Sequence, residues 1–297
     1  MDLQFEQNTQ LNNNKVIDDT NDQVNNLSND QVNNLSNDQV NNLSNDQVNN
    51  LSNDQVNNLS NNQVNNLSNE QTYKDSCKLN SLSHVKLISY TKNANDDKNL
   101  EEIIVYSARV SNPASQYTNM NNDKLIKYLM DNAHWSPFEM ASICLEINTT
   151  RDISRQILRH STFSFQEFSQ RYAKANLGFE IREARLQDNK NRQNSIETND
   201  DELNAKWIQL QKNVIQTSLN AYEWALSNGI AKEQARVVLP EGNTMTKLYI
   251  NGTLRSWIHY IKLRSGNGTQ IEHKKIAIDC ANAIKPIFPL ISNFISV

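Results

Sequence analysis

The sequence predicts an α+β domain over residues 79–297, preceded by a low-complexity segment over residues 1–78. Helix-like and strand-like patterns alternate along the second part without the steady rhythm of a doubly wound sheet. The first part is dominated by Asn, Gln, Asp and Ser, and residues 1–75 contain two aromatic residues, Phe5 and Tyr73. Such a segment has too little apolar surface to offset the entropy of ordering, so we expect it to be disordered.

An octapeptide repeat fills most of the first part. The motif Asn-Asp-Gln-Val-Asn-Asn-Leu-Ser occurs six times over residues 21–68, with Asn62 replacing Asp in the last copy. A coiled coil is not expected, because an eight-residue repeat drifts by about 80° per copy against two helical turns. Each copy is also far shorter than a usual solenoid unit. Disorder is the interpretation, with an aggregation- or partner-binding role as the alternative.

Apolar periodicity predicts the elements at the start of the folded part. Alternating side chains favour strands, and a 3.6-residue period favours amphipathic helices. The expected elements, in chain order, are a strand over 84–90, a helix over 121–132, a strand over 140–147 and a helix over 148–158. Asn148 or Thr149 is expected to cap the last of these helices.

The longest predicted element is a helix over residues 201–228. Leu203, Trp207, Leu210 and Val214 share one of its faces, and Gly229 supplies a stop signal. Before it, polar residues 188–200 are expected to form a flexible loop. The elements expected after it are a short helix ending at Pro240, a strand over 247–253, a helix over 254–263, a turn over 265–269 and a helix over 270–287.

Charge separates the two parts of the chain. Residues 1–75 carry two Lys and eleven acidic residues, a net charge of −9, whereas the whole chain is −4. Residues 76–297, with 27 basic and 22 acidic side chains, therefore sum to +5. A mildly basic domain suits a protein that binds phosphates.

Cysteines and apolar runs indicate the compartment. Cys77, Cys144 and Cys280 are odd in number and far apart, so neither a zinc site nor a disulfide framework is expected. The N-terminus has no signal- or transit-peptide pattern, and no apolar run approaches the roughly 20 residues of a membrane span. We expect a cytosolic protein without a membrane partner or bound metal, and leave entry into the nucleus open.

Arginine residues form the most informative pattern. Arg151, Arg155 and Arg159 recur every fourth residue, which places them on one helical face. A partly buried segment that contains Arg171 follows directly. Ion pairs with Asp152 and Glu167 are one explanation, but they would satisfy two of these four arginines. Phosphate binding is the other, because a guanidinium fork matches phosphate oxygens.

Three more arginines lie further along the chain. Arg236 sits at an apolar helix end, and Arg255 and Arg264 are nine residues apart in one helix, about 180° around its axis. Arg255 and Arg264 should therefore face different partners. Each alone is typical of a salt-bridged surface residue, and together they suggest that separate segments converge on anions.

Residues 159–172 resemble the signature of the flavin-dependent thymidylate synthases, R-H-R-x-x-S-x-N-x-x-S-x-R-Y. Six of the eight specified positions match: Arg159, His160, Ser164, Ser169, Arg171 and Tyr172. Segments 108–111, 134–139, 236–240 and 255–264 are also similar to family segments, in family order, so the resemblance covers about residues 80–290. Ser161 replaces a basic residue of the signature, and Gln166 replaces its Asn.

The resemblance implies reductive methylation of dUMP to dTMP. The carbon would come from 5,10-methylenetetrahydrofolate and the reducing equivalents from NADPH through FAD. It also implies a compact domain with a mixed sheet and flanking helices, assembled as a homotetramer with sites between subunits. By similarity, the residues lining FAD would be Ser111, His134, Ser136, Arg159, His160, Ser161, Glu167, Thr253, Arg255 and His259. Those holding dUMP would be Gln156, Arg159, Glu167, Phe168, Ser169, Gln170, Arg171, Arg236 and Arg264.

Arg264 is the predicted catalytic residue. The C5 carbon of uracil becomes nucleophilic when negative charge develops over N3 and the carbonyl oxygens, and a fixed cation stabilises that charge. Ser164 and Ser169 are not expected to act as nucleophiles, because no Ser-His-Asp arrangement is visible.

Two other functions remain as alternatives. An arginine-rich RNA-binding domain would carry scattered basic residues and exposed aromatics. A nucleotide-binding flavoprotein that oxidises NADPH without methylation is conceivable because Ser161 departs from the signature. Since the arginines lie within apolar helices, the sequence favours a closed pocket for small molecules over a nucleic-acid surface.

Overall fold

The computed structural model describes residues 85–94, 99–116 and 122–296, all within one unit, Asn69–Val297. The octapeptide repeats, the expected boundary at residue 79 and Cys77 lie outside these ranges. The predictions made for them therefore stay predictions.

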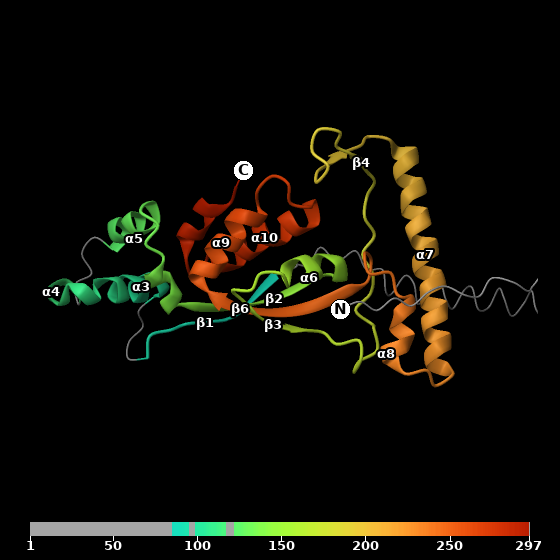
Figure 1. Ribbon diagram of the computed structural model, residues 1–297, viewed down its shortest axis with the longest axis horizontal. Helices are drawn as coiled ribbons and strands as arrows, with labels where there is room; N and C mark the ends of the chain where they lie inside the picture. The colour runs from blue at the N-terminus through green and yellow to red at the C-terminus, as the bar shows by residue number, and fades with distance from the viewer. Residues whose placement is uncertain (1–84, 95–98, 117–121, 297) are drawn as a thin grey trace, which may run out of the picture. The chain divides into compact units, whose positions relative to one another are not determined.

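A four-stranded antiparallel sheet forms the centre of the unit (Figure 1). Its strand order is β1-β2-β6-β3. The strands are β1 (Val85–Tyr90), β2 (Ser142–Thr150), β6 (Met245–Thr253) and β3 (Ser164–Glu167). The predicted α+β class with flanking helices is confirmed, although all three pairings are antiparallel where a mixed sheet was expected.

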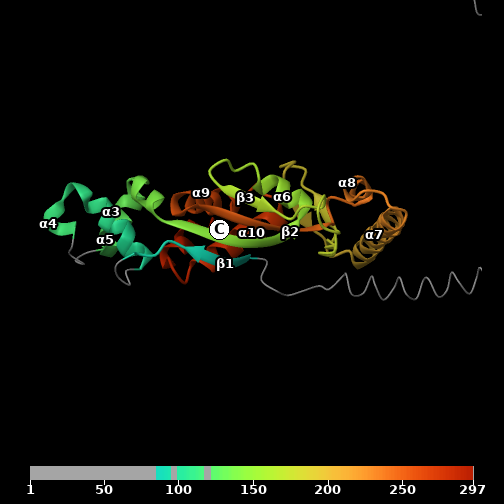
Figure 2. The ribbon, with the colours of Figure 1, turned by 90° about the horizontal axis from the view of Figure 1, so that it is seen from below.

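Helices cover one side of this sheet and extend beyond both of its ends (Figures 1 and 2). The helices against the sheet are α6 (Arg151–Ile157), α9 (Leu254–Arg264) and α10 (Ile271–Ile284). At one end lie α3 (Leu100–Ala108), η1 (Arg109–Ser111), α4 (Pro113–Gln116), α5 (Asn122–Asp131) and η2 (Ser136–Met140). At the other end lie β4 (Arg185–Gln187), β5 (Ser195–Glu197), α7 (Asp201–Ser227), α8 (Lys232–Ala235) and η3 (Arg236–Val238). A last short helix is η4 (Pro289–Phe294).

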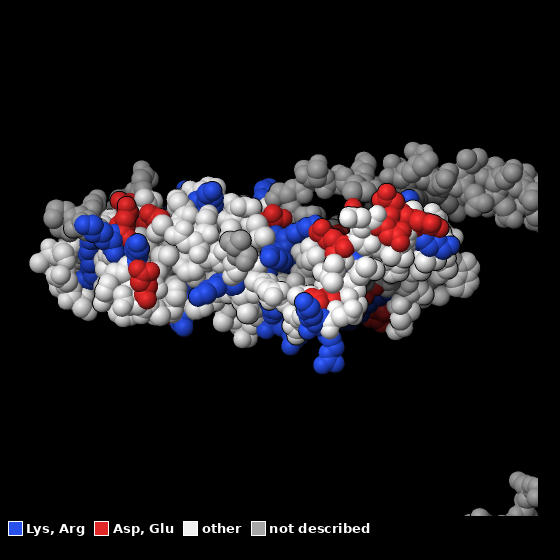
Figure 3. All heavy atoms as spheres, turned by 90° about the horizontal axis from the view of Figure 1, so that it is seen from above, with Lys and Arg blue, Asp and Glu red and all other residues white. Residues whose placement is uncertain are grey.

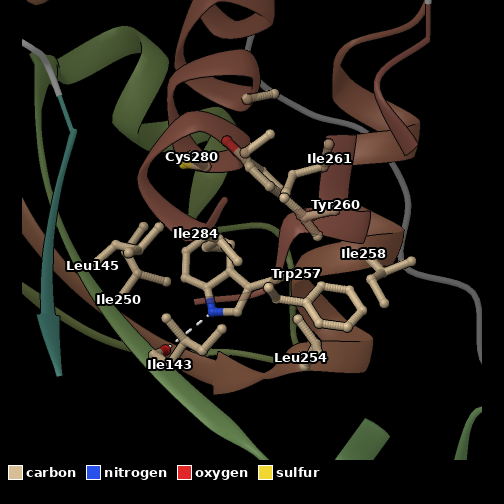
Figure 4. Packing of buried hydrophobic residues seen from close by; sticks show 14 of the residues in the cluster. Ile143, Leu145, Ile250, Leu254, Trp257, Ile258, Tyr260, Ile261, Cys280 and Ile284 are labelled. Carbon is tan, nitrogen blue, oxygen red and sulfur yellow. Dashed lines mark hydrogen bonds between the residues drawn. The ribbon is translucent and has the colours of Figure 1, made fainter. Parts of the chain in front are cut away.

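The core lies between the sheet and helices α9 and α10 (Figure 4). Alternation along β2 buries Ile143, Leu145 and Ile147 completely, as the strand pattern predicts. Trp257 of α9 packs over them, and its indole N–H donates to the Ile143 carbonyl at 3.0 Å. This bond satisfies the one polar atom of the buried indole. The core thus holds α9 at a set height above the sheet.

One glycine allows β6 to approach the segment before β3. A Cβ added to Gly252 would lie 2.3 Å from the Phe163 ring, which itself packs on Trp257. Any larger residue would displace Phe163 and the residues of the signature beside it.

The predicted boundary between the second strand and its following helix is wrong. Strand β2 continues through Thr150, because Asn148, Thr149 and Thr150 pair with β6. Neither Asn148 nor Thr149 caps α6. The N-cap position is Thr150, whose hydroxyl donates to Asp152 rather than accepting from the helix. β-branched threonines favour the extended conformation wherever a partner strand is available.

Other differences concern short or marginal elements. The predicted loop over 188–200 contains strand β5, which pairs with β4. Helix α3 was not predicted, although its capping box, formed by Asn99 and Glu102, is a recognisable sequence signal. Helix α10 ends at Ile284, three residues earlier than predicted. The predictions for β1, α5, α7, β6, α9 and the 265–269 turn are confirmed within one to three residues at each end.

Helix α7 presents its predicted apolar face to solvent. Leu203, Trp207, Leu210 and Val214 are 41–52% exposed, whereas the buried positions are Gln211, Ile215, Tyr222 and Ala225. Periodicity therefore located the helix but not the face that the rest of the chain covers. Across the ranges that the structure describes, none of the helices has the length and apolarity to cross a membrane.

Candidate functional site

A pocket of about 310 Å³ opens where α6, α8 and η3 meet. Arg151 and Arg155 of α6 line it together with Arg236 of η3, so three guanidinium groups face one space. The remaining lining residues are Gln170, Glu233, Val237, Leu239 and Glu241. Arg236 is some 80 residues from α6 in the chain, and the fold brings it to the same pocket.

Two arginines around this pocket form ion pairs with exposed carboxylates. Arg155 pairs with Glu241 at 3.1 Å and Arg171 with Glu233 at 3.6 Å. All four side chains are more than half exposed, so each pair contributes little to stability. A ligand phosphate, with two charges and several acceptor oxygens, would compete effectively for these guanidinium groups.

The alternative explanation by ion pairs with Asp152 and Glu167 is realised only in part. Glu167 lies 3.6 Å from Arg151. Asp152 instead accepts two hydrogen bonds from Arg182, at 2.8 and 2.9 Å, and pairs with none of the four arginines considered from the sequence. Arg159 is exposed and has no ion pair or hydrogen bond with any residue in the described ranges. Arg182 lies 30 residues after Asp152 in the sequence, and periodicity within a helix or strand does not predict a contact over that separation.

Gln170 lines the pocket and also has a buried side-chain nitrogen. Its side chain is 4% exposed, and within the described part of the chain its Nε2 has no hydrogen-bond partner. Buried polar groups are nearly always paired, and an unpaired amide in a pocket wall is suited to a ligand. Gln170 and Arg236 are thus the two predicted dUMP residues that line this pocket.

Arg264 and His160 form a second group at the C-terminal end of α9. The Arg264 Nε donates to His160 Nε2 at 2.9 Å. Burial, Arg264 and Arg159 together lower the pKa of His160 to about 4, so the imidazole is neutral near pH 7 and can accept this bond. Arg255, at the other end of α9, bonds to Glu139 at 2.5 Å. The expectation that Arg255 and Arg264 face different partners is confirmed.

Gln156 belongs to the same group, although it neighbours Arg155 in sequence. Its Nε2 donates to Gln270 at 2.7 Å, and its Oε1 lies 3.3 Å from His273 Nδ1. His273 is fully buried and was not singled out from the sequence. A polar residue on the otherwise apolar face formed by Ile276, Ala277 and Cys280 was the signal that could have identified it.

A third group lies where η2 meets the start of α9. It includes His134, Ser136, Thr253, Arg255 and His259 of the predicted FAD residues. The Trp135 ring packs edge-on against His259, with centroids 5.0 Å apart, and Thr253 caps α9 by accepting from Ser256 N–H. His134, Ser136 and His259 are exposed. The group combines donors, an arginine and aromatic rings on one surface.

Comparisons with known proteins identify the family and the fold of this chain. Residues 86–290 match the family described as thymidylate synthase complementing protein. The chain belongs to this family. It is 49% identical over 204 residues to a probable flavin-dependent thymidylate synthase of Paramecium bursaria Chlorella virus 1, covering 68% of this chain and 92% of the relative. It is also 49% identical over 193 residues to the flavin-dependent thymidylate synthase of Synechocystis, covering 65% and 87%.

A solved structure shares the fold of this flavin-dependent thymidylate synthase family member. The UMP/dUMP methylase PolB of Streptomyces cacaoi, solved with 5-Br dUMP, has a TM-score of 0.61 and 26% identity. The match covers 71% of this chain and 93% of that one. The resemblance inferred from the signature is therefore confirmed at the level of family and fold.

The signature residues of this family member connect the pocket to the sheet. Glu167, at the end of β3, accepts from Ser154 at 2.9 Å and Thr246 at 3.0 Å. The Phe168 N–H donates to the Lys247 carbonyl, which continues the alignment with β6 for one residue. Ser169, Gln170 and Arg171 then leave the sheet toward the pocket. Glu167 is thus held by the protein itself, with one oxygen engaged by two hydroxyls.

The remaining predicted FAD residues occupy separate places. Ser161 is exposed in the turn between α6 and β3, and Ser111 is exposed in η1. No hydrogen bond or ion pair joins Ser111 to the groups above among the residues that the structure describes. The three groups and Ser111 thus stay predictions as parts of one site.

Proposed function

We propose that the protein catalyses reductive methylation of dUMP to dTMP, with 5,10-methylenetetrahydrofolate as the carbon donor and NADPH as the reductant through FAD. The observation that carries this proposal is the pocket of about 310 Å³ that gathers three arginines and a buried amide donor. It lies on the helix that also carries Gln156. The names of the relatives, and the 5-Br dUMP bound to PolB, support the same substrate.

The pocket would hold the phosphate of dUMP. Arg151, Arg155 and Arg236 supply planar forks that match phosphate oxygens, and the unpaired Nε2 of Gln170 supplies a neutral donor. Glu233 and Glu241 also line the pocket, and they would release their arginines when the dianion enters. The phosphate would then fix the position of the rest of the nucleotide.

Arg264 would stabilise the charge that develops on the uracil ring. Its bond to neutral His160 uses the Nε–H and leaves the terminal N–H groups available to carbonyl oxygens. A cation held in place before the reaction stabilises the transition state without reorganisation. A guanidinium remains protonated in proteins, so it acts as a fixed charge rather than as a base.

The residues around η2 and the start of α9 fit a flavin nucleotide. Arg255 and the Ser136 hydroxyl suit phosphate oxygens, while His259, His134 and the Trp135 ring offer faces for a planar ring system. When bound, FAD supplies two-electron transfer between NADPH and the methylene carbon. This chain's own residues bind and orient it.

We also infer a homotetramer with sites between subunits. The exposed apolar face of α7, formed by Leu203, Trp207, Leu210 and Val214, is typical of a surface that another copy covers. A shared site would explain why the three groups of predicted residues lie on separate elements of one chain. Size-exclusion chromatography with light scattering measures the assembly directly.

A single preparation tests the proposed function. The purified full chain should carry a yellow chromophore and, without oxygen, convert dUMP to dTMP in the presence of methylenetetrahydrofolate and NADPH. Arg236→Ala should raise the KM for dUMP by roughly 10- to 100-fold, the scale of a lost charge-assisted hydrogen bond. Arg192→Ala, an exposed arginine outside the pocket, is the matched control and should leave the KM unchanged.

Two results would point to the alternative functions. NADPH oxidation without dTMP indicates a flavoprotein that lacks methylation. A colourless protein with salt-dependent RNA affinity indicates an RNA-binding domain. On the face shown in Figure 3, the described Lys and Arg side chains are interspersed with Asp and Glu instead of forming a continuous positive stripe, which favours the enzyme.

A further inference from the structure

A hydrogen-bonded chain of five polar side chains runs from the N-terminus of α10 to the middle of α9, the helix that ends at Arg264. Its members are Glu272, Gln270, Gln156, His273 and Tyr260. The four links measure 3.0, 2.7, 3.3 and 3.1 Å in that order. All are partly or fully buried, so each link matters to the group on either side.

The carboxylate of Glu272 sets the direction of every bond in this chain. Arg185 lies 2.6 Å from it. Burial acts to raise the pKa of Glu272, but hydrogen bonds from its own backbone, Arg185 and Gln270 outweigh burial and lower the pKa. The group is therefore an ionised acceptor that offers no proton.

The donor and acceptor roles then follow link by link. Gln270 must direct its Nε2 at Glu272, so its Oε1 faces Gln156. Gln156 must donate to that oxygen, so its own Oε1 faces His273 and accepts from Nδ1–H. The His273 Nε2 is left as an acceptor for the Tyr260 hydroxyl. Burial, Arg264 and His160 lower the pKa of His273 to about 3, which agrees with a neutral ring.

Gln156 consequently has one amide orientation, with one N–H and one oxygen lone pair left unused. It follows Arg155 of the pocket in sequence, and its partner His273 lies close enough to Arg264 to feel that charge. A nucleotide with its phosphate among the pocket arginines and its base at Arg264 would pass Gln156.

We propose that the Glu272-anchored chain fixes the Gln156 amide so that it reads uracil and rejects cytosine. This proposal rests on the proposed function. Uracil presents a carbonyl oxygen at C4 and an N–H at N3, which match the amide N–H and oxygen. Cytosine presents an amino group and a lone pair at the same two positions, so it needs the amide turned over. The hydrogen bonds to Gln270 and His273 prevent this rotation of the Gln156 amide, because it would place two oxygens, or two N–H groups, in contact.

Calorimetric titration of the flavin-loaded full chain with dUMP and with dCMP tests the proposal. A well-placed pair of hydrogen bonds discriminates between bases by 1–3 kcal/mol, so wild type should bind dUMP roughly 10- to 100-fold more tightly than dCMP. Gln156→Ala should reduce this ratio to about 3-fold or less. A Gln156→Ala variant that keeps the wild-type ratio would overturn the assignment of Gln156.

A matched pair of variants tests the anchor. Glu272→Gln and Arg185→Gln both remove the ion pair between these residues, but only Glu272→Gln supplies a group that can donate and so permits the reversed chain. Glu272→Gln should lose most of the dUMP preference, and Arg185→Gln should keep it. Equal ratios in the two variants would refute the inference. If Glu272→Gln does not fold, His273→Leu is the substitute, because it removes the hydrogen bond to the Gln156 oxygen. His273→Leu should also lose the preference for dUMP over dCMP. A folded His273→Leu variant with the wild-type ratio would overturn the inference.

The two proposals fail differently in these experiments. A wild-type protein that neither binds dUMP nor forms dTMP contradicts the proposed function. One that forms dTMP but binds dUMP and dCMP equally contradicts only the role of the Glu272 chain.

Discussion

Removing the titration of His273 should flatten the pH dependence of stability. Burial is the main reason that the pKa of this imidazole falls from 6.5 to about 3, with smaller contributions from Arg264 and His160. The unfolded chain therefore takes up the proton first as the pH falls. Stability supplied by neutral His273 is present above pH 6.5 and is lost progressively between pH 6.5 and pH 3.

The size of the effect follows from the two pKa values. The full shift corresponds to about 5 kcal/mol. Over the narrower range from pH 7 to pH 5, proton linkage gives a loss of about 2 kcal/mol for this one group. His160, whose pKa falls to about 4, acts in the same direction but is partly exposed and should contribute less.

His273→Gln is the appropriate variant, because a glutamine amide can donate to Gln156 and accept from Tyr260 without titrating. Urea unfolding of wild type and variant at pH 7 and pH 5 should show a loss smaller by about 2 kcal/mol in the variant. His259→Gln, at an exposed histidine, is the control and should change the pH dependence much less. Identical pH dependence in wild type and His273→Gln would show that His273 is already charged or solvated in the folded state.

Three further predictions concern catalysis. Arg264→Ala should lower dTMP formation by roughly 10²- to 10³-fold, while FAD stays bound and NADPH oxidation without dUMP changes little. Arg264→Lys should restore activity only in part. Near-normal turnover of Arg264→Ala at saturating dUMP, or loss of its FAD, would disprove the role of Arg264. Ser161→Arg should leave activity intact or tighten FAD binding, measured by flavin fluorescence, and weaker retention would indicate a co-adapted pocket. A chain beginning at Ser76 should fold and turn over like the full chain, since the repeats carry no candidate site residue, and an inactive but flavin-loaded product would contradict this.

Local patterns predicted the elements that depend on neighbours in sequence. Alternation identified β2 and β6, because successive strand residues face opposite sides whatever the partner strand is. Gly229, the predicted stop signal, follows α7 in a left-handed conformation with φ of 77°. Arg151 and Arg155 are four residues apart, which placed both on one helical face, and both line the pocket.

Partners that are distant in sequence were outside the reach of those patterns. An ion pair of Asp152 with a nearby arginine was one explanation considered from the sequence, but the chain returns 30 residues later to bring Arg182 against it. The helix boundary near Thr150 was missed because pairing with Met245 extends β2. In both cases the competing interaction comes from a segment whose position only packing determines.

The sequence by itself determined the family, the α+β class and the residue types of the candidate site. Only the tertiary structure decided that Arg236 joins α6 in one pocket, that the apolar face of α7 is left uncovered, and that His273 holds Gln156. The physical reason is the range of the interactions. Periodicity and capping act within a few residues, whereas hydrogen bonds between groups more than 100 residues apart require the sheet and its helices to be assembled first.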